Sequence, residues 1–204
     1  MSRRILVVPT NHRAEITATS LGLAHALDEI GASVGYLKPL AQVPVGQIRH
    51  AELLMEQVLT HLDVPEPISL QEIERDLARG DDGDLMEKVL AGSEHVLNEH
   101  DVVIVEGVLP TEHQIYSGRV NHALAQALDA EVLLVAGVND TTLPTLLSKV
   151  AGAAAFYSVG EASRVVGVFL TGVPSNSATG AQDFAAGLAT EGLRLVGVAQ
   201  DAPE

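Results

Sequence analysis

The chain has 204 residues and no cysteine, its residues are 47% apolar but only 3% aromatic, and its formal net charge is -15. The charge argues against binding to nucleic acid or to an anionic membrane, and the lack of cysteine excludes disulfides and thiolate chemistry. No apolar run approaches the roughly 20 residues of a membrane span, and the run behind the N-terminal arginines is too short for a signal peptide, so we expect a cytoplasmic protein.

The first predicted element is a strand, followed by a turn and a helix. An apolar run, Ile5 to Val8, leads into a polar turn, and helical spacing begins near Ile16. This is the position of a phosphate-binding loop, in which backbone amides and a helix N-terminus surround a phosphate. The residues of the loop are Thr10, Asn11, His12, Arg13, Ala14, Glu15, Ile16 and Thr17.

This loop lacks the residues that phosphate binding needs. It contains no glycine for close backbone approach and no lysine for the outer phosphates. If Thr17 stands at the Ser/Thr position, Ile16 stands at the lysine position and Glu15 at that of the preceding glycine. His12 and Arg13 could hold an anion without glycines, or could belong to a solvated loop. The Glu15 carboxylate counts against a phosphate, because it would repel the anion.

The spacing predicts a helix from Ile16 to Ile30 with Gly31 as its C-cap, and then a strand from Ser33 to Lys38 that Pro39 stops. A strand-helix-strand unit of this kind implies a right-handed parallel crossover. The next segment, up to Gly83, is less regular.

Within that segment the sequence predicts one amphipathic helix carrying Leu54, Val58 and Leu62. A second, short helix follows, with Ser69 and Glu72 as its capping box and its end near Gly80. The run Asp81 to Asp84 is interpreted as a solvated turn with a helix cap, since a metal-binding loop would need carboxylates at alternating positions. A helix with Leu85, Val89 and Val96 on its inner face comes next.

The clearest predicted strand runs from Asp101 to Gly107, because its four consecutive β-branched residues indicate a central strand buried on both faces. Ligands of open parallel sheets bind beyond the carboxyl ends of the strands, and Glu106 lies there. Glu106 could hold Mg²⁺, or it could accept hydrogen bonds from loop amides and only shape the cleft.

The rest of the chain alternates between helices and strands. The predicted elements are a helix with Val120, Leu124 and Leu128, a strand at 131–136, a helix at 143–157, a strand at 164–170, a loop at 172–180, a helix at 181–191 and a strand at 193–199. Six apolar strands alternating with helices predict a single domain, 1–204, with an α/β three-layer, doubly wound and mostly parallel sheet.

The strand ends should meet at one edge of this sheet. We expect Lys38, Glu106, Gly107 and Thr171 to line a cleft there, together with the first loop. Lys38 could bind a phosphate or carboxylate, or could be a surface lysine beside a strand. No histidine pair has metal-ligand spacing, and there is no G-x-S-x-G motif of a serine hydrolase.

Motifs spread along the chain carry a family resemblance. They are P-T at 9–10, T-x-x-S-L-G at 17–22, L-K-P-L-A-Q at 37–42, D-L-M-E at 84–87, V-E-G-V-L-P-T at 105–111, Asn121, and A-L-D-A-E-V at 127–132. In order and spacing the sequence resembles the N-terminal domain of bacterial phosphate acetyltransferases, relatives of dethiobiotin synthetase and of the P-loop amidoligases. The match is weakest at about residues 43 to 80.

The resemblance implies several roles. In catalytic relatives Gly-Lys-Thr/Ser stands where this chain has Glu15, Ile16 and Thr17. Lys38 matches a lysine that contacts substrate and phosphate, and Glu106 matches a metal-binding acid. Thr171-Gly172 stands where many relatives have a base-recognising pair. With half of the nucleotide site replaced, we expect no cofactor and no Mg-nucleotide.

The resemblance also implies a function. We expect a non-catalytic regulatory and assembly domain of an enzyme that converts acetyl-CoA and phosphate to acetyl phosphate and CoA, with the chemistry in a separate C-terminal domain. That domain would be its partner, in a homo-oligomer that could respond to a small metabolite. The alternatives are an ATP-dependent ligase like dethiobiotin synthetase, which would use Glu106 and Lys38, and a free-standing metabolite sensor with an anion site at His12 and Arg13.

Overall fold

The computed structural model describes residues 2–12, 14–42, 64–110, 116–138, 142–159, 162–174 and 178–200. Arg13 and the helix predicted around Leu54, Val58 and Leu62 lie outside these residues. The elements are β1 (Arg3–Pro9), α1 (Ile16–Glu29), β2 (Val34–Leu37), α3 (Leu70–Arg79), α4 (Asp82–Glu99), β3 (Val102–Glu106), α5 (Ser117–Ala127), β4 (Glu131–Gly137), α6 (Leu143–Phe156), β5 (Ser158–Val159), β6 (Ala162–Ser163), β7 (Val165–Val173), α7 (Ala178–Thr190) and β8 (Leu195–Gln200).

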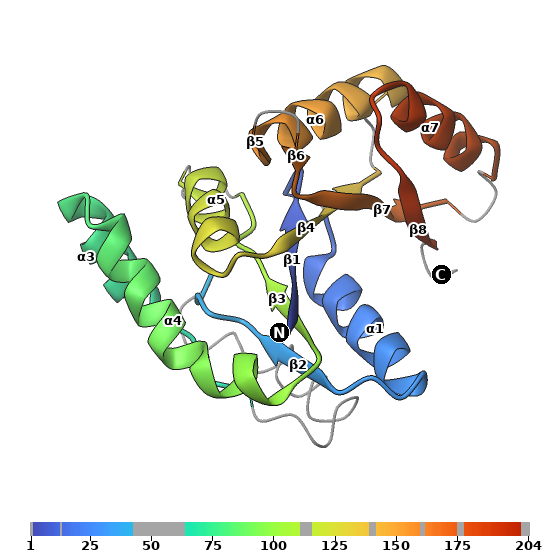
Figure 1. Ribbon diagram of the computed structural model, residues 1–204. Helices are drawn as coiled ribbons and strands as arrows, with labels where there is room; N and C mark the ends of the chain where they lie inside the picture. The colour runs from blue at the N-terminus through green and yellow to red at the C-terminus, as the bar shows by residue number, and fades with distance from the viewer. Residues whose placement is uncertain are drawn as a thin grey trace.

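Six of the strands form one parallel sheet in the order β2-β3-β1-β4-β7-β8 (Figure 1). The chain moves from β1 to β2 in one direction along the sheet, and from β2 through β3, β4 and β7 to β8 in the other. Because such crossovers are right-handed, reversing the direction changes the face on which the connecting helix lies. The topology therefore places α1 on one face and α4, α5, α6 and α7 on the opposite face.

Two apolar clusters match these two faces. The larger one joins α4, α5, α6 and α7 to one side of the sheet through residues such as Leu85, Leu124, Val150 and Phe184. The smaller one joins α1 to the other side, and Ile16 is among its buried residues. Both clusters consist mostly of Val, Leu, Ile and Ala, as expected for a parallel sheet buried on both faces. The predicted three-layer α/β fold is confirmed.

The predicted ends of α3 agree with the structure, whereas the predicted start of α4 agrees only in part. The capping box is confirmed, since the Ser69 side chain accepts a hydrogen bond from the backbone amide of Glu72, and α3 ends at Gly80 in a left-handed conformation with φ 76°. Of the turn and helix cap predicted from Asp81 to Asp84, Asp81 is the N-cap of α4, but the residues from Asp82 already belong to the helix rather than to a turn. Acidic residues are favourable in the first turn of a helix, where they face its positive end.

Two further differences concern strands. The strand predicted to end at Leu170 continues to Val173, so Thr171, expected at the end of the strand, lies within β7. Two-residue β5 and β6 form an antiparallel pair that the sequence did not predict, since such short strands carry no alternating pattern.

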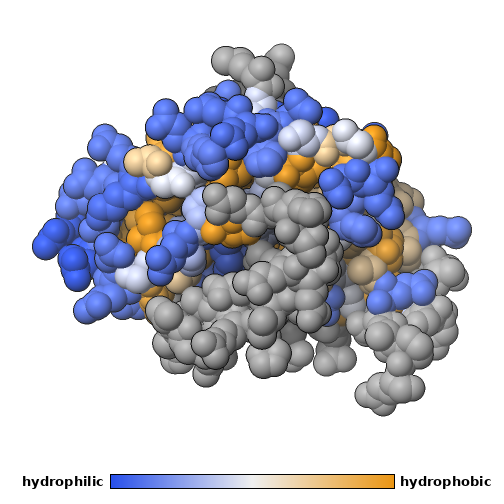
Figure 2. Space-filling view, turned by 90° about the horizontal axis from the view of Figure 1, so that it is seen from below, coloured by the Kyte–Doolittle hydropathy of each residue, from blue (hydrophilic) through white to orange (hydrophobic). Residues whose placement is uncertain are grey.

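Seen from below, the residues whose placement is described are largely hydrophilic, with apolar patches between them (Figure 2). None of the helices in the described part of the chain is long and apolar enough to span a membrane.

Candidate functional site

The first loop is attached to the neighbouring strand β4. After β1 ends at Pro9, the amide of Thr10 donates to the carbonyl of Val135 at 2.8 Å. The side-chain amide of Asn11 donates to the carbonyl of Gly137 at 2.9 Å. These two bonds hold the start of the loop against the sheet at its C-terminal edge.

The amides at the start of α1 donate to groups of the protein itself. The backbone N–H of Glu15 donates to the Thr171 hydroxyl at 3.3 Å, and that of Ile16 donates to the carbonyl of Ala14 at 3.0 Å. In a phosphate loop, amides at this position point at the anion. Here the hydroxyl oxygen of Thr171 on β7, a residue that is only 1% exposed, accepts the hydrogen bond that an anion would accept in a phosphate loop.

The lysine position is part of the apolar core. Ile16 is 1% exposed and belongs to the same cluster as Val7, Tyr36 and Val135. The Ile16 side chain therefore packs between α1 and the sheet and does not point toward a ligand. Thr17 is half-buried, whereas His12 and Glu15 are exposed. The loop thus occupies the position of a phosphate loop between β1 and α1, but Ile16 at its lysine position packs in the core and stabilises the fold.

Lys38 and Glu106 meet at the ends of β2 and β3. The register pairs Leu37 with Val105, so the next residues along the two strands are neighbours. The ammonium group of Lys38 lies 2.7 Å from Oε1 of Glu106, and the two side chains are 14% and 1% exposed. The buried carboxylate is therefore compensated by a neighbouring cation.

Tyr36 completes this group. It lies in β2 two residues before Lys38 and so on the same face of the strand. Its hydroxyl donates to Oε2 of Glu106 at 2.6 Å. Burial, and next the Glu106 carboxylate, raise the pKa of Tyr36 above its usual value, so the phenol stays protonated and remains a donor. Oε2 of Glu106 thus has a hydrogen bond from Tyr36, whereas the buried Oε1 faces the Lys38 ammonium as an ion pair without a hydrogen bond of its own.

The loop after β3 is fixed by two side-chain amides. Asn121 on α5 accepts from the amide of Val108 at 2.7 Å and donates to its carbonyl at 2.8 Å. Gln42 donates to the carbonyl of Gly107 at 3.0 Å and accepts from the amide of Leu109 at 2.8 Å. This pairing satisfies the buried backbone groups that a loop would otherwise leave without partners.

Gly107 itself is required by close packing. A Cβ atom at this position would lie 2.7 Å from the carbonyl oxygen of Val7 and 2.9 Å from Oδ1 of Asn121. The backbone oxygen cannot give way without moving β1. The glycine therefore lets the loop pass close to the central strand.

The arrangement does not fit a metal ion at Glu106. A divalent cation needs several oxygen ligands, and both oxygens of this carboxylate are engaged by Lys38 and Tyr36. The described residues contain no group of three or more His, Asp or Glu side chains that could hold a metal.

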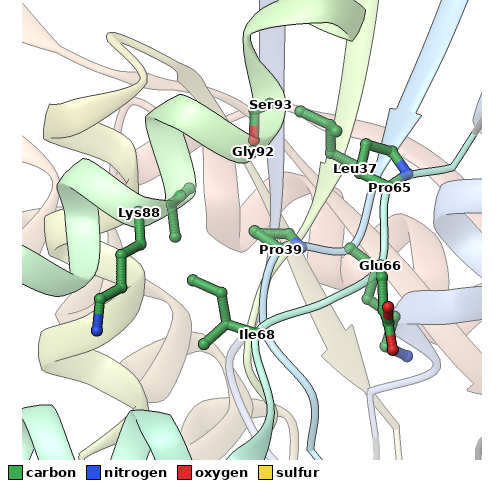
Figure 3. Close-up of a pocket in the computed structure, with 10 residues that line it drawn as sticks. Leu37, Pro39, Pro65, Glu66, Ile68, Lys88, Gly92 and Ser93 are labelled. Atoms are coloured by element: carbon green, nitrogen blue, oxygen red, sulfur yellow. The ribbon is translucent and has the colours of Figure 1, made fainter.

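One small cavity lies beside the end of β2, on the face of α4 (Figure 3). Its volume is about 30 Å³, which is room for roughly one or two waters rather than a metabolite. Its lining comes from the end of β2, the segment before α3, and α4: Leu37, Lys38, Pro39, Pro65, Glu66, Ile68, Lys88, Val89, Gly92 and Ser93.

The structure brings together some of the residues expected in the cleft. Lys38 contacts Glu106, Gly107 follows directly, and Thr171 reaches the start of α1. The sequence did not single out Tyr36, Gln42 or a structural role for Asn121. Tyr36 had a usable signal, because it precedes Lys38 by two residues and so lies on the same face of the strand.

The sequence of this chain is similar to a known protein family and to known enzymes. A family model described as an AAA domain matches residues 3–201. Phosphate acetyltransferase from Pseudomonas aeruginosa is 37% identical over 188 residues, which cover 88% of this chain and 26% of that protein. The enzyme of the same name from Pseudomonas putida is 36% identical over 183 residues, with coverages of 88% and 26%. The chain spans about a quarter of the length of these relatives.

Among solved structures, the 54 kDa protein of the signal recognition particle from Aeropyrum pernix, in complex with GDP, has a TM-score of 0.68. It is 17% identical, and the match covers 99% of this chain and 42% of that one. At this identity the likeness concerns the fold alone. The family match along nearly the whole sequence is more specific, and the chain belongs to this AAA domain family, with phosphate acetyltransferases among its relatives.

Proposed function

We propose that this chain is the N-terminal, non-catalytic regulatory and assembly domain of a phosphate acetyltransferase. The enzyme would convert acetyl-CoA and phosphate to acetyl phosphate and CoA through a C-terminal domain outside these 204 residues. The proposal also includes a cytoplasmic location, a homo-oligomer and the response of the enzyme to a small metabolite. Its support is the similarity to a quarter of the length of enzymes with that name.

The observation that carries the non-catalytic role is the closure of the phosphate-loop position by the protein's own groups. Thr171 accepts from the amide that an anion would use, and Ile16 is core. Phosphoryl transfer depends on amides, a lysine and a metal arranged around the phosphates. Here the amide of Glu15 already donates to Thr171, and Ile16 occupies the lysine position.

The same contacts disfavour a ligase of the dethiobiotin synthetase type. That function would need Glu106 for a metal and Lys38 for substrate. In this structure the two side chains neutralise each other, with Tyr36 on the second carboxylate oxygen. Separating them would leave a buried carboxylate without a counter-charge, which is costly.

Two activity assays on the purified chain test the proposal. The first mixes acetyl-CoA with phosphate and follows release of CoA by a thiol reagent, to which this chain contributes no background because it has no cysteine. The second follows phosphate release from ATP with Mg²⁺. We expect neither activity. Acetyl transfer by the chain alone, or ATP turnover that depends on Mg²⁺ and is lost in Glu106→Gln, would contradict the proposed role.

A further inference from the structure

We draw no further inference here: the strongest candidate, the aromatic cluster that His122 on α5 forms with Phe156 and Tyr157 at the end of α6, leaves Phe156 54% exposed, but nothing in the described part of the structure shows what covers it.

Discussion

The pair of Lys38 and Glu106 gives the sharpest energetic prediction. Replacing Lys38 with methionine keeps the length of the side chain but leaves a carboxylate that is 1% exposed without its cation. Removing one partner of a buried pair costs about 3 to 5 kcal/mol, and the Tyr36 hydrogen bond should hold the cost near the lower limit. This is a large part of the roughly 5 to 15 kcal/mol that stabilises a typical domain.

Glu106→Gln should cost less, about 1 to 2 kcal/mol. The amide oxygen still accepts from Tyr36, and Lys38, at 14% exposure, can turn its ammonium toward water. In the double variant no unpaired charge remains. We therefore expect its destabilisation to be smaller than the sum of the two single effects by about 2 kcal/mol.

The assay is urea unfolding at pH 7, followed by far-ultraviolet circular dichroism, for the four members of this cycle. The control is the same cycle on Arg119 and Asp82, an ion pair whose side chains are 57% and 35% exposed, where the coupling should be about 0 to 1 kcal/mol. Additive effects at Lys38 and Glu106, within about 0.5 kcal/mol, would refute the reasoning and would leave Lys38 available to a ligand.

Three further predictions concern the same region and the tyrosines. Ile16→Lys should lower the free energy of unfolding by about 3 kcal/mol or more without creating nucleotide binding, because it buries a charge in the core, whereas Ile16→Leu should cost less than about 1.5 kcal/mol. Thr171→Val should cost about 1 kcal/mol by removing the acceptor for an amide of the loop, and Thr171→Ser should restore most of it, both measured by urea unfolding. The pKa values of Tyr36, Tyr116 and Tyr157 are all raised in the folded protein. Above about pH 10 the unfolded tyrosines ionise while the folded ones do not, so the free energy of unfolding should fall as the pH rises. Tyr36→Phe should reduce the slope of this free energy against pH by about 1.4 kcal/mol per pH unit. Absorbance at long ultraviolet wavelengths reports tyrosinate, and its appearance from Tyr36 before unfolding would contradict this prediction.

The order of elements could be predicted because each strand of the sheet is a continuous apolar run and each helix has a regular apolar face. β3 is the best case, since its residues from Val103 to Glu106 are all buried. The ends of α3 could be predicted from local signals. The Ser69 side chain caps the first turn by accepting from the amide of Glu72, and Gly80 adopts the left-handed conformation that ends a helix. The predicted end of this strand at Leu170 was three residues too early, because β7 continues through Gly172 and spacing alone cannot tell where such a strand stops.

The site could be predicted only in part. Parallel strands end at one edge, so the proximity of Lys38 and Glu106 followed from topology. Their direct pairing did not, because it depends on side-chain conformations and on the burial of Glu106. The acceptor role of Thr171 toward the start of α1 joins residues 156 positions apart, which no local pattern reports.

Isothermal titration of the intact chain with ATP and Mg²⁺ tests the central claim most directly, namely that the phosphate-loop position is closed by the protein's own groups. The account predicts no saturable binding heat up to roughly millimolar nucleotide, because the amide of Glu15 is taken by Thr171 and the lysine position is core. A saturable heat with one nucleotide per chain, abolished by Glu106→Gln, would contradict it.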